Sequence, residues 1–382
     1  MDKGCNIRFF DKELNFLGEV DNFTSLIFIK SWETYGEFNI LINNFNKDLF
    51  KKQNIIMINN NPFKIGTIEY IEINGTNSTK IKGFTLGYWF TNRVTYPPVG
   101  QEYDSYNTNI EDIMKGLVLK NAVEPDDSSR KIPKLIIKTS SGKGYKVNFQ
   151  TRFKYLSDEL TSLSKLSGLG WGIYLDFENK QFVFDVFEGK NLTTEQNILP
   201  HKVFSSEYDN ISNKNYITSD IDAKNVAIVA GQGEGVNREI QIINNNLSGL
   251  ERKELFVDAR DIQDNESLSD RGNIKLSENK SVETFECETL NLGYITEWDL
   301  GDIVTILDKE LGYLEHSRII EVTESYENGK FTIEPTFGTI TSKFTDKLKQ
   351  ILDIPRNEVN RIIISSTEPE GPIGQVWIKD LE

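Results

Sequence analysis

Three glycines at alternate positions are the first residues whose spacing suggests chemistry. Gly231, Gly233 and Gly235 follow a strand-like stretch at residues 225–230. A dinucleotide site needs the spacing Gly-x-Gly-x-x-Gly and a helix directly after it, because the amides at the start of that helix face the pyrophosphate. Here the spacing differs, and residues 236–243 continue as a strand. The sequence therefore predicts a glycine-rich hairpin or bulge, in which glycine permits a positive φ or close backbone packing.

Glycoside hydrolysis and calcium binding are the activities that the carboxylates suggest. The chain has 58 Asp and Glu residues, but no two of them stand out as the pair that a glycosidase places across a cleft. Asp258 and Asp261 flank Ala259 and Arg260 without the spacing of a dedicated calcium loop. A solvated or salt-bridged surface is the better interpretation of this segment.

Nucleophiles and metal ligands are scarce in the sequence. The two cysteines, Cys5 and Cys287, lie far apart, and neither His201 nor His316 has a second His or Cys at metal-ligand spacing. No Gly-x-Ser-x-Gly elbow is present. We therefore predict no catalytic, no cofactor-binding and no metal-binding residue, and a protein that is not an enzyme.

Four tryptophans could stack on sugar rings. They are Trp89, Trp171, Trp298 and Trp377. A carbohydrate site would need several of them exposed in one cleft. Each one sits beside strand-like apolar residues, so we expect them to pack in a core or an interface.

The net charge excludes several kinds of partner. The 382 residues include 43 Lys and Arg against 58 Asp and Glu, which gives a net charge of −15. A domain that grips nucleic acid carries clustered Lys and Arg, and an anionic membrane surface would repel this chain. Residues 251–310 hold 16 acidic and 7 basic residues, so this segment has a net charge of −9 out of the total net charge of −15. Because no apolar signal region and no run of ~20 apolar residues occurs, we expect a soluble chain without membrane insertion.

The pattern of apolar residues predicts a mainly β protein with α+β insertions. Residues 1–97 alternate short strands with tight turns, which is typical of an antiparallel β-barrel. Residues 98–204 are predicted to form an α+β insertion domain. Residues 205–340 are predicted to form a second β-barrel, with 236–284 as an insertion. A C-terminal helix and an extended attachment tail, or a simple edge strand, are expected over 341–382.

A faint internal repeat relates the two strand-rich regions. Residues 54–58 (Asn-Ile-Ile-Met-Ile) resemble residues 302–306 (Asp-Ile-Val-Thr-Ile). Residues 67–72 resemble residues 318–323 at an offset of 251. The repeat predicts two related β-barrels, one towards each end of the chain, with other material inserted between them.

Several short sequence motifs, taken in order, resemble those of a known family. They are Ser31-Trp32 through Gly36-Glu37-Phe38, the aromatic segment 87–93, the Gly-Leu-Gly-Trp stretch at 168–171, residues 229–235 with Arg238, residues 255–261, and residues 300–304 with Arg318 and Phe337-Gly338. Over about residues 5–340, this set resembles the tail-hub, or baseplate-hub, proteins of long-tailed bacteriophages of Gram-positive hosts.

The resemblance implies a fold with two tube-like β-barrels and inserted domains. It also implies a structural virion protein, assembled in the host bacterial cytoplasm, that forms a homotrimer. Its six barrels would make a pseudo-sixfold ring that joins the sixfold tail tube to a threefold tip, spike or other baseplate protein. The tape-measure protein would be a further neighbour, and DNA would pass through without specific binding. A contractile bacteriocin particle, a phage-tail-like injection system, could use the same hub.

The acidic balance suggests a role within such a ring. A channel that passes DNA should not bind it, and carboxylates in its wall would repel phosphates. We hypothesise that part of the excess in residues 251–310, or carboxylates of the barrel strands, faces the lumen. The alternative functions are a carbohydrate-binding or receptor-binding tail protein and a polysaccharide-degrading enzyme.

Overall fold

The computed structural model describes residues 5–43, 45–74, 78–262, 268–290, 293–310, 312–327, 329–339, 363–365 and 377–379. The chain divides into two compact units, residues 1–339 and residues 340–382. Strands predominate in the first unit, which confirms the predicted mainly β class. In the second unit, β22 (Ile363–Ser365) pairs in parallel with β23 (Trp377–Lys379). The helix expected within 341–382 lies outside the described residues.

The N-terminal region forms a five-stranded antiparallel motif, which we call the first motif. Its strands are β3 (Ser25–Ser31), β4 (Glu37–Ile42), β5 (Ile55–Ile58), β6 (Ile65–Asn74) and β7 (Ser78–Thr85). They pair in the order β3-β4-β7-β6-β5, and β1 (Ile7–Phe10) and β2 (Phe16–Val20) continue the sheet beyond β5. Because alternate residues of a strand point to opposite faces, Phe28, Phe38 and Ile81 lie together in one buried core.

The C-terminal part of the same unit forms a second motif of the same design. Its strands are β14 (Ile211–Ser219), β18 (Val282–Thr289), β19 (Ile303–Asp308), β20 (Tyr313–Glu327) and β21 (Lys330–Thr339). They pair in the order β14-β18-β21-β20-β19, which repeats the order of the first motif. The short strand β13 (Val203–Ser205) runs parallel to β19. Phe204, Phe285 and Phe337 pack in the core of this motif.

A β-bulge at equivalent places in the two motifs confirms the predicted repeat. The register between β6 and β7 shifts between Ile68 and Tyr70. The register between β20 and β21 shifts between Ile319 and Glu321, which are the same positions at the offset of 251. A bulge bends a strand and increases its twist. In each motif the bulge lies where the long strand stops pairing with the neighbour that joins its first half, which is β5 for β6 and β19 for β20.

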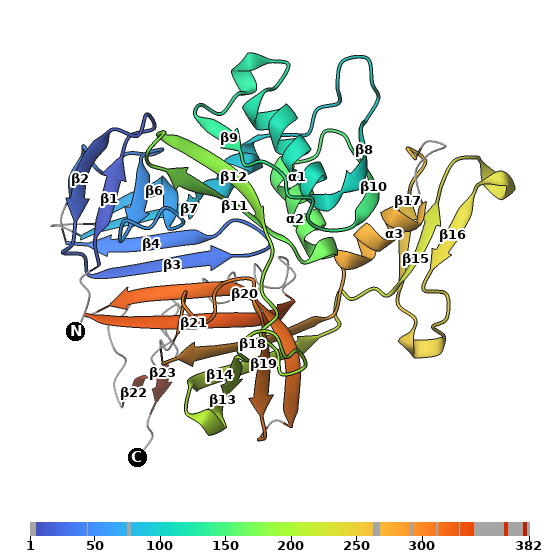
Figure 1. Ribbon diagram of the computed structural model, residues 1–382. Coiled ribbons are helices and arrows are strands. Elements are labelled where there is room, and N and C mark those ends of the chain that lie inside the picture. Colours follow the sequence, from blue (N-terminus) through green and yellow to red (C-terminus); the bar gives the residue numbers. More distant parts are fainter. Residues whose placement is uncertain are drawn as a thin grey trace. The chain divides into compact units, whose positions relative to one another are not determined.

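The two motifs join in one sheet instead of closing as two barrels. Beyond its bulge, β20 pairs antiparallel with β3, from Glu321 opposite Ser31 to Glu327 opposite Ser25. In Figure 1 the blue strands β3 and β4 lie directly beside the orange strands β20 and β21. Among the strands that the structure describes, the hydrogen-bonded path has two ends and forms no ring. This differs from the expected pair of closed barrels, because the second half of β20 is bonded to the other motif.

An α+β region lies between the two motifs in sequence. Its elements are β8 (Asp104–Asn109), α1 (Ile110–Val118), β9 (Leu135–Ile137), β10 (Lys146–Thr151), α2 (Leu156–Ser167), β11 (Gly170–Asp176) and β12 (Gln181–Phe187). The Asn109 side chain caps α1 by accepting the backbone N–H of Asp112 at 2.9 Å, and Gly168 ends α2 in the left-handed conformation. The apolar sides of both helices and of β11 and β12 share one core.

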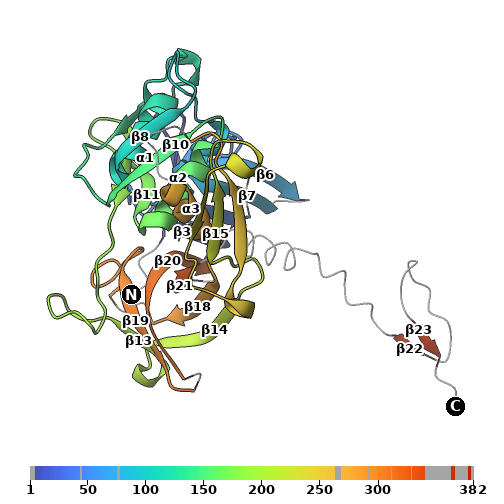
Figure 2. The ribbon, with the colours of Figure 1, turned by 90° about the vertical axis from the view of Figure 1, so that its right-hand side faces the viewer.

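A second inserted region lies between β14 and β18. Its strand β15 (Val226–Ala230) pairs antiparallel with β16 (Ile240–Ile243) and parallel with β17 (Glu254–Asp258). Helix α3 (Leu268–Ser277) packs on this small sheet, which faces the viewer in Figure 2. Short helical turns complete the description: 3-10 turns at Leu86–Asn92, Ser128–Arg130, Ser206–Tyr208, Gly235–Asn237 and Gly249–Glu251, and a π turn at Leu119–Val123.

Candidate functional site

One face of the second motif carries clustered carboxylates, and we call it the acidic face. Its members are Glu286 and Glu288 on β18, Glu321 and Glu327 on β20, and Glu334 on β21. They alternate with buried residues such as Phe285, Val322 and Ile333, so they point away from the core. The register brings the strands' acids together, since Glu286 and Glu321 both lie opposite Thr336.

The carboxylates of the acidic face influence the ionisation of one another, as Glu334 illustrates. Burial raises the pKa of Glu334, and the charges of Glu288, Glu286 and Glu327 raise it further. Like charges disfavour the ionised form of a carboxyl group. Lys330 offsets part of this repulsion, and its Nζ lies 3.3 Å from Glu288 Oε1. The face as a whole therefore presents negative charge.

The corresponding face of the first motif is mixed in charge. On β7, Lys80 and Lys82 alternate with the buried residues Thr79 and Ile81, so both lysines lie on the side away from the core. Glu37 lies opposite Phe84 on the same side. The acidic character thus belongs mainly to the second motif. Two members of the acidic face lie within residues 251–310, and the other three lie after it.

Trp32, directly after β3, joins three segments that are far apart in sequence. Its indole N–H donates to the Gly168 carbonyl at 2.9 Å, and the Arg318 guanidinium lies 5.8 Å from the ring centre. A Cβ atom at Gly170 or Gly301 would lie 2.4 or 2.2 Å from ring carbons, so neither position accepts a side chain. The fold therefore brings into contact the sequence motifs that contain Trp32, Gly168, Gly170, Gly301 and Arg318.

A buried ion pair links the two motifs, and no local pattern in the sequence predicts it. Lys64, just before β6, is 5% exposed, and Glu324 on β20 is fully buried. Lys64 Nζ lies 2.5 Å from Glu324 Oε2. The hydroxyls of Tyr294 and Tyr326 donate to the same carboxylate at 2.7 and 3.1 Å. Burial, followed by the Glu324 charge, raises the pKa of Tyr294. With three donors around it, the Glu324 carboxylate is well satisfied at this junction.

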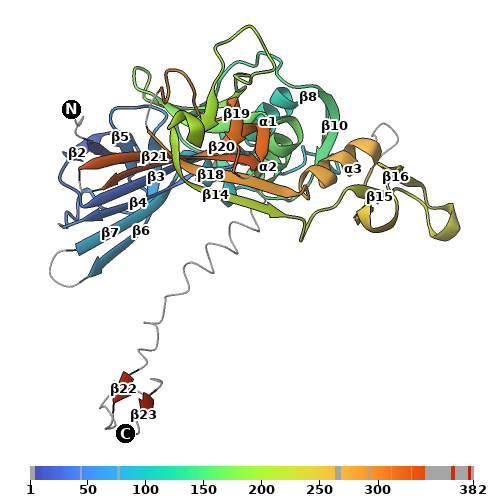
Figure 3. The same cartoon turned by 90° about the horizontal axis from the view of Figure 1, so that it is seen from below.

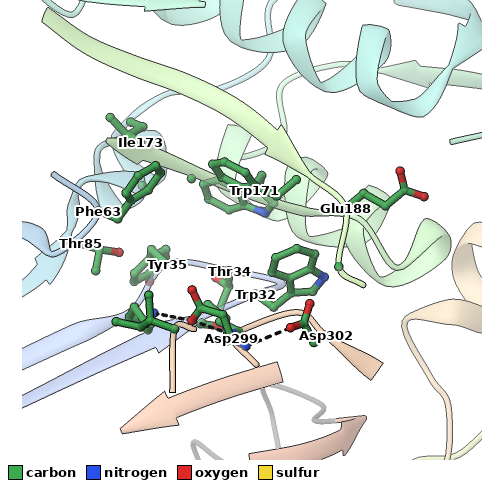
Figure 4. A pocket seen from close by; sticks show the side chains of 18 of the residues that line it. Trp32, Thr34, Tyr35, Phe63, Thr85, Trp171, Ile173, Glu188, Asp299 and Asp302 are labelled. Carbon is green, nitrogen blue, oxygen red and sulfur yellow. Dashed lines mark hydrogen bonds and ion pairs between the residues drawn. The ribbon is translucent and has the colours of Figure 1, made fainter. Parts of the chain in front are cut away.

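A pocket of about 370 Å³ lies beside Trp32 (Figure 4). Its wall includes the aromatic rings and carboxyl groups of Trp32, Tyr35, Phe63, Trp171, Glu188, Asp299 and Asp302. The Asp302 carboxylate accepts the backbone N–H of Lys190 at 2.8 Å and of Asp299 at 3.0 Å. Burial raises the pKa of Asp302. Lys30 Nζ lies 3.0 Å from the Asp299 carboxylate. Two of the acids therefore hold the loops that form the wall, and the aromatic rings supply an apolar surface.

A match to a protein-family model shows which family this chain belongs to. The family model described as Siphovirus ReqiPepy6 Gp37-like protein matches residues 6–339. The chain belongs to this family. This match confirms the predicted relationship to the tail proteins of long-tailed phages. A comparison with curated proteins found no match.

Solved structures of prophage tail proteins share the fold of this tail protein family. The 43 kDa tail protein of prophage MuSo2 from Shewanella oneidensis is 12% identical, with a TM-score of 0.56 over 87% of this chain and 98% of that one. A tail protein from Neisseria meningitidis MC58 is 12% identical, with a TM-score of 0.55 over 87% and 96%. Prophage tail protein gp18 from Listeria monocytogenes EGD-e is 12% identical, with a TM-score of 0.52 over 92% and 99%.

In this chain, the glycine run forms the predicted hairpin between β15 and β16. The strand begins at Ile240 instead of residue 236, because Gly235–Asn237 is a 3-10 turn. Arg238 closes the hairpin by donating to the Gly231 carbonyl at 3.0 Å. Asp258 is paired with both Arg238 and Arg260, and hydrogen bonds from Arg260 hold the pKa of Asp258 well below its usual range. The salt-bridged interpretation of this segment is therefore confirmed.

The scarce cysteines and histidines lie apart in the fold. Both cysteines are buried and unpaired with each other; burial raises the pKa of Cys5 to about 12 and also raises that of Cys287. His201 contacts the Gln196 carbonyl, and His316 contacts Thr305 and Glu195. In the described part of the chain, no three side chains of the types His, Cys, Asp and Glu are grouped to hold a metal ion.

The tryptophans follow the expectation of packing where their side chains are described. Trp171 and Trp298 are buried, and Trp89 packs against the core of the α+β region. Trp377 lies in β23. None of the helices formed by the described residues is both long enough and apolar enough to cross a membrane.

Proposed function

We propose that this chain is the subunit of a tail hub. Three copies would form a ring of six five-stranded motifs, and the ring would join the sixfold tail tube to a threefold tip or baseplate. The observation that carries the proposal is the duplication: two motifs with one strand order and one bulge position lie in each chain. A duplicated subunit in a closed trimer presents six similar units, which matches a sixfold tube on one side.

The division of the chain follows from the same proposal. Residues 1–97 and 205–340 would be the two ring-forming domains. The α+β region at 98–204 and the insertion at 236–284 would project from the ring towards other baseplate proteins. Residues 341–382 would be an attachment tail. The partners of the assembled hub would be the tail-tube protein, a tip or spike protein and the tape-measure protein, and assembly would take place in the host bacterial cytoplasm.

The acidic face supports a non-binding wall for DNA. In the proposed ring, the sheet face that points away from the core lines the channel, so the five carboxylates would face passing phosphates. Charges of one sign along a channel wall repel a polyanion over roughly a Debye length, ~10 Å at 0.1 M salt. Replacement of Glu286, Glu288, Glu321 and Glu334 by Lys should create binding to double-stranded DNA at low salt. Continued absence of binding in the charge-reversed variant would show that the face does not meet DNA.

The test of the hub itself is a mass measurement of the purified chain, alone and mixed with tail-tube protein. Native mass spectrometry and analytical ultracentrifugation should show a trimer, and the trimer should bind tube protein. A chain that stays monomeric at every concentration and does not respond to tube protein would refute the proposal. Electron microscopy of the trimer should show a ring with an open centre.

The aromatic pocket favours a second candidate function, carbohydrate binding. Its rings, Trp32, Tyr35, Phe63 and Trp171, are of the kind that stack on sugars. However, both indole N–H groups are already used, that of Trp32 by Gly168 and that of Trp171 by the Glu33 carbonyl at 2.9 Å. Binding to a glycan array that Phe63→Ala removes would support this function. A hub without glycan affinity would show no binding before or after the change.

A further inference from the structure

The second half of β20 pairs with β3. The equivalent half of β6 has no such additional partner among the strands that the structure describes. The first half of β20 pairs with β19, and after the bulge its second half pairs with β3. The first half of β6 pairs with β5 in the same way. After its bulge, β6 pairs with β7 alone among the strands that the structure describes. The first motif therefore presents an open strand edge at the place where the second motif holds β3.

Burial along the two long strands reflects this difference. At the offset of 251, Val322 corresponds to Ile71 and Glu324 corresponds to Ile73. Val322 and Glu324 are both fully buried beneath the junction with β3. Ile73, in contrast, is 52% exposed, and Tyr70 at the start of the open edge is 46% exposed. The unpaired backbone N–H and C=O groups of a free strand edge are a template for pairing with another chain, and exposed apolar side chains along that edge favour the association.

The strand equivalent to β3 in the second motif is β14, and it forms one end of the described sheet. Phe28 of β3 lies opposite Phe38 of β4, and Tyr216 of β14 lies opposite Phe285 of β18 in the matching position. Strand β14 pairs only with β18 within the described part of the sheet. In the strand order β14 is at one end of the sheet and β6 lies towards the other end; Figure 3 shows β6 at the left of the molecule and β14 nearer its centre. Among the described strands, each copy thus offers the second half of β6 and the outer edge of β14 for pairing with another copy.

We propose that the open half of β6 in one copy pairs antiparallel with β14 of the next copy. The register follows from the internal junction: Ser31 lies opposite Glu321, Lys30 opposite Val322, and Phe28 opposite Glu324. The equivalent positions place Tyr70 opposite Ser219, Ile71 opposite Thr218, and Ile73 opposite Tyr216 of the second copy. This inference rests on the proposed trimeric hub and names the strands that would close it. A head-to-tail contact of this kind forms a ring when its rotation closes.

Disulfide trapping tests the register. The backbone N–H of Trp32 donates to the Ile320 carbonyl at 2.8 Å, so Trp32 and Ile320 are a hydrogen-bonded pair of the ladder. The next pair, Ser31 and Glu321, is therefore a non-hydrogen-bonded pair with close Cα atoms. The equivalent pair, Tyr70 and Ser219, should therefore accept a disulfide. The variant Tyr70→Cys/Ser219→Cys, after mild oxidation, should migrate as a covalent trimer without reductant and as a monomer with it.

The matched control is Tyr70→Cys/Ile217→Cys, in which the second cysteine lies on the same face two residues away. This control and both single variants should give no covalent trimer, because the native cysteines are buried. If native mass spectrometry shows a trimer but the Tyr70/Ser219 variant does not cross-link, the strand pairing is wrong and the hub proposal survives. If no trimer forms under any condition, including with tube protein, the hub proposal fails first.

A surface substitution gives an independent measurement. Ile73→Lys places a charge on the open edge and should raise the trimer dissociation constant by about tenfold or more, the equivalent of ~1.4 kcal/mol. Ile240→Lys is the control, because Ile240 on β16 is also 52% exposed but lies in the inserted sheet. Both variants should keep the thermal midpoint of the wild-type monomeric fold. Equal dissociation constants for the two variants would overturn the proposed edge.

Discussion

Breaking the ion pair between Lys64 and Glu324 should uncouple the two motifs more than any surface change. The charged atoms lie 2.5 Å apart, and both side chains are almost fully buried. At an effective dielectric constant of ~20, two unit charges at this distance attract by about 7 kcal/mol. Desolvation costs several kcal/mol per ion and offsets much of this attraction. The net value of the pair is therefore small, but the loss of one partner is costly.

The perturbation is a double-mutant cycle. Lys64→Met leaves the Glu324 carboxylate without its cation, and Glu324→Gln leaves the Lys64 ammonium without its anion. Each single variant should lose about 3–5 kcal/mol of unfolding free energy. In the double variant no uncompensated charge remains, and Gln can still accept the Tyr294 hydroxyl. Its loss should be about 1–3 kcal/mol, which gives a coupling energy of roughly 3 kcal/mol or more.

The assay is equilibrium unfolding in urea, followed by tryptophan fluorescence. Trp298 is a suitable probe, since its ring lies 5.0 Å from that of Tyr294. Lys51→Met is the control, because Lys51 and its partner Asp48 are 59% and 73% exposed, and it should cost no more than ~0.5 kcal/mol. If the loss in the double variant equals the sum of the two single losses within ~0.5 kcal/mol, the pair is not coupled and the reasoning is refuted.

Three further predictions concern single positions. Burial and neighbouring acids raise the pKa of Glu334, so its ionised form opposes folding above that pKa. Glu334→Gln should therefore stabilise the fold at pH 7, by no more than ~0.5 kcal/mol because the side chain is partly exposed. This gain should disappear at pH 4, where the carboxyl group is protonated. Burial alone would raise the pKa of Glu111, but the Lys115 ammonium and nearby backbone amides lower it to about 2. The stability that the ionised Glu111 contributes is therefore present above its ordinary pKa and is lost as the pH falls towards 2. Glu111→Gln should therefore cost about 3 kcal/mol at pH 7 and much less near pH 3, as measured by thermal unfolding at each pH. Gly301→Ala would place a Cβ 2.2 Å from the Trp32 ring at a φ of +91°, and should cost about 2–5 kcal/mol. Gly249→Ala, also at positive φ but in open space, should cost only ~1–2 kcal/mol in the same urea assay, and equal losses for the two glycines would contradict the packing argument.

Much of the architecture could be predicted from local patterns. Alternation of apolar residues marked the strands, because a half-buried strand repeats every two residues. The offset of 251 between residues 67–72 and 318–323 marked the duplicated motif, and the bulges at Ile68 and Ile319 follow the same offset. The hairpin at Gly231 to Gly235 and the salt-bridged surroundings of Asp258 were also predictable, since turn chemistry and charge spacing are local properties.

The site residues were harder to predict, because their neighbours are distant in sequence. Lys64 and Glu324 are 260 residues apart, and nothing beside either residue indicates that it is buried or paired. The glutamates of β18, β20 and β21 share one face only because three strands align in a particular register. Trp32 belongs to a short motif that is visible in the sequence, but its contacts with Gly170 and Gly301 depend on how three segments meet.

The sequence by itself determined the strand content, the duplicated order of strands, the acidic balance and the lack of familiar catalytic spacing. Those features follow from residue type and short-range periodicity. Only the tertiary structure decided that β20 leaves β19 for β3 and that the two motifs share one sheet. It also decided that the second half of β6 and one side of β14 have no partner among the described strands. The physical reason is that backbone hydrogen bonds are the same for every pair of strands. The partner of a strand edge is therefore set by the bulges, by the side chains buried beneath it and by pairs such as Lys64 and Glu324, and not by the alternation of the strand itself.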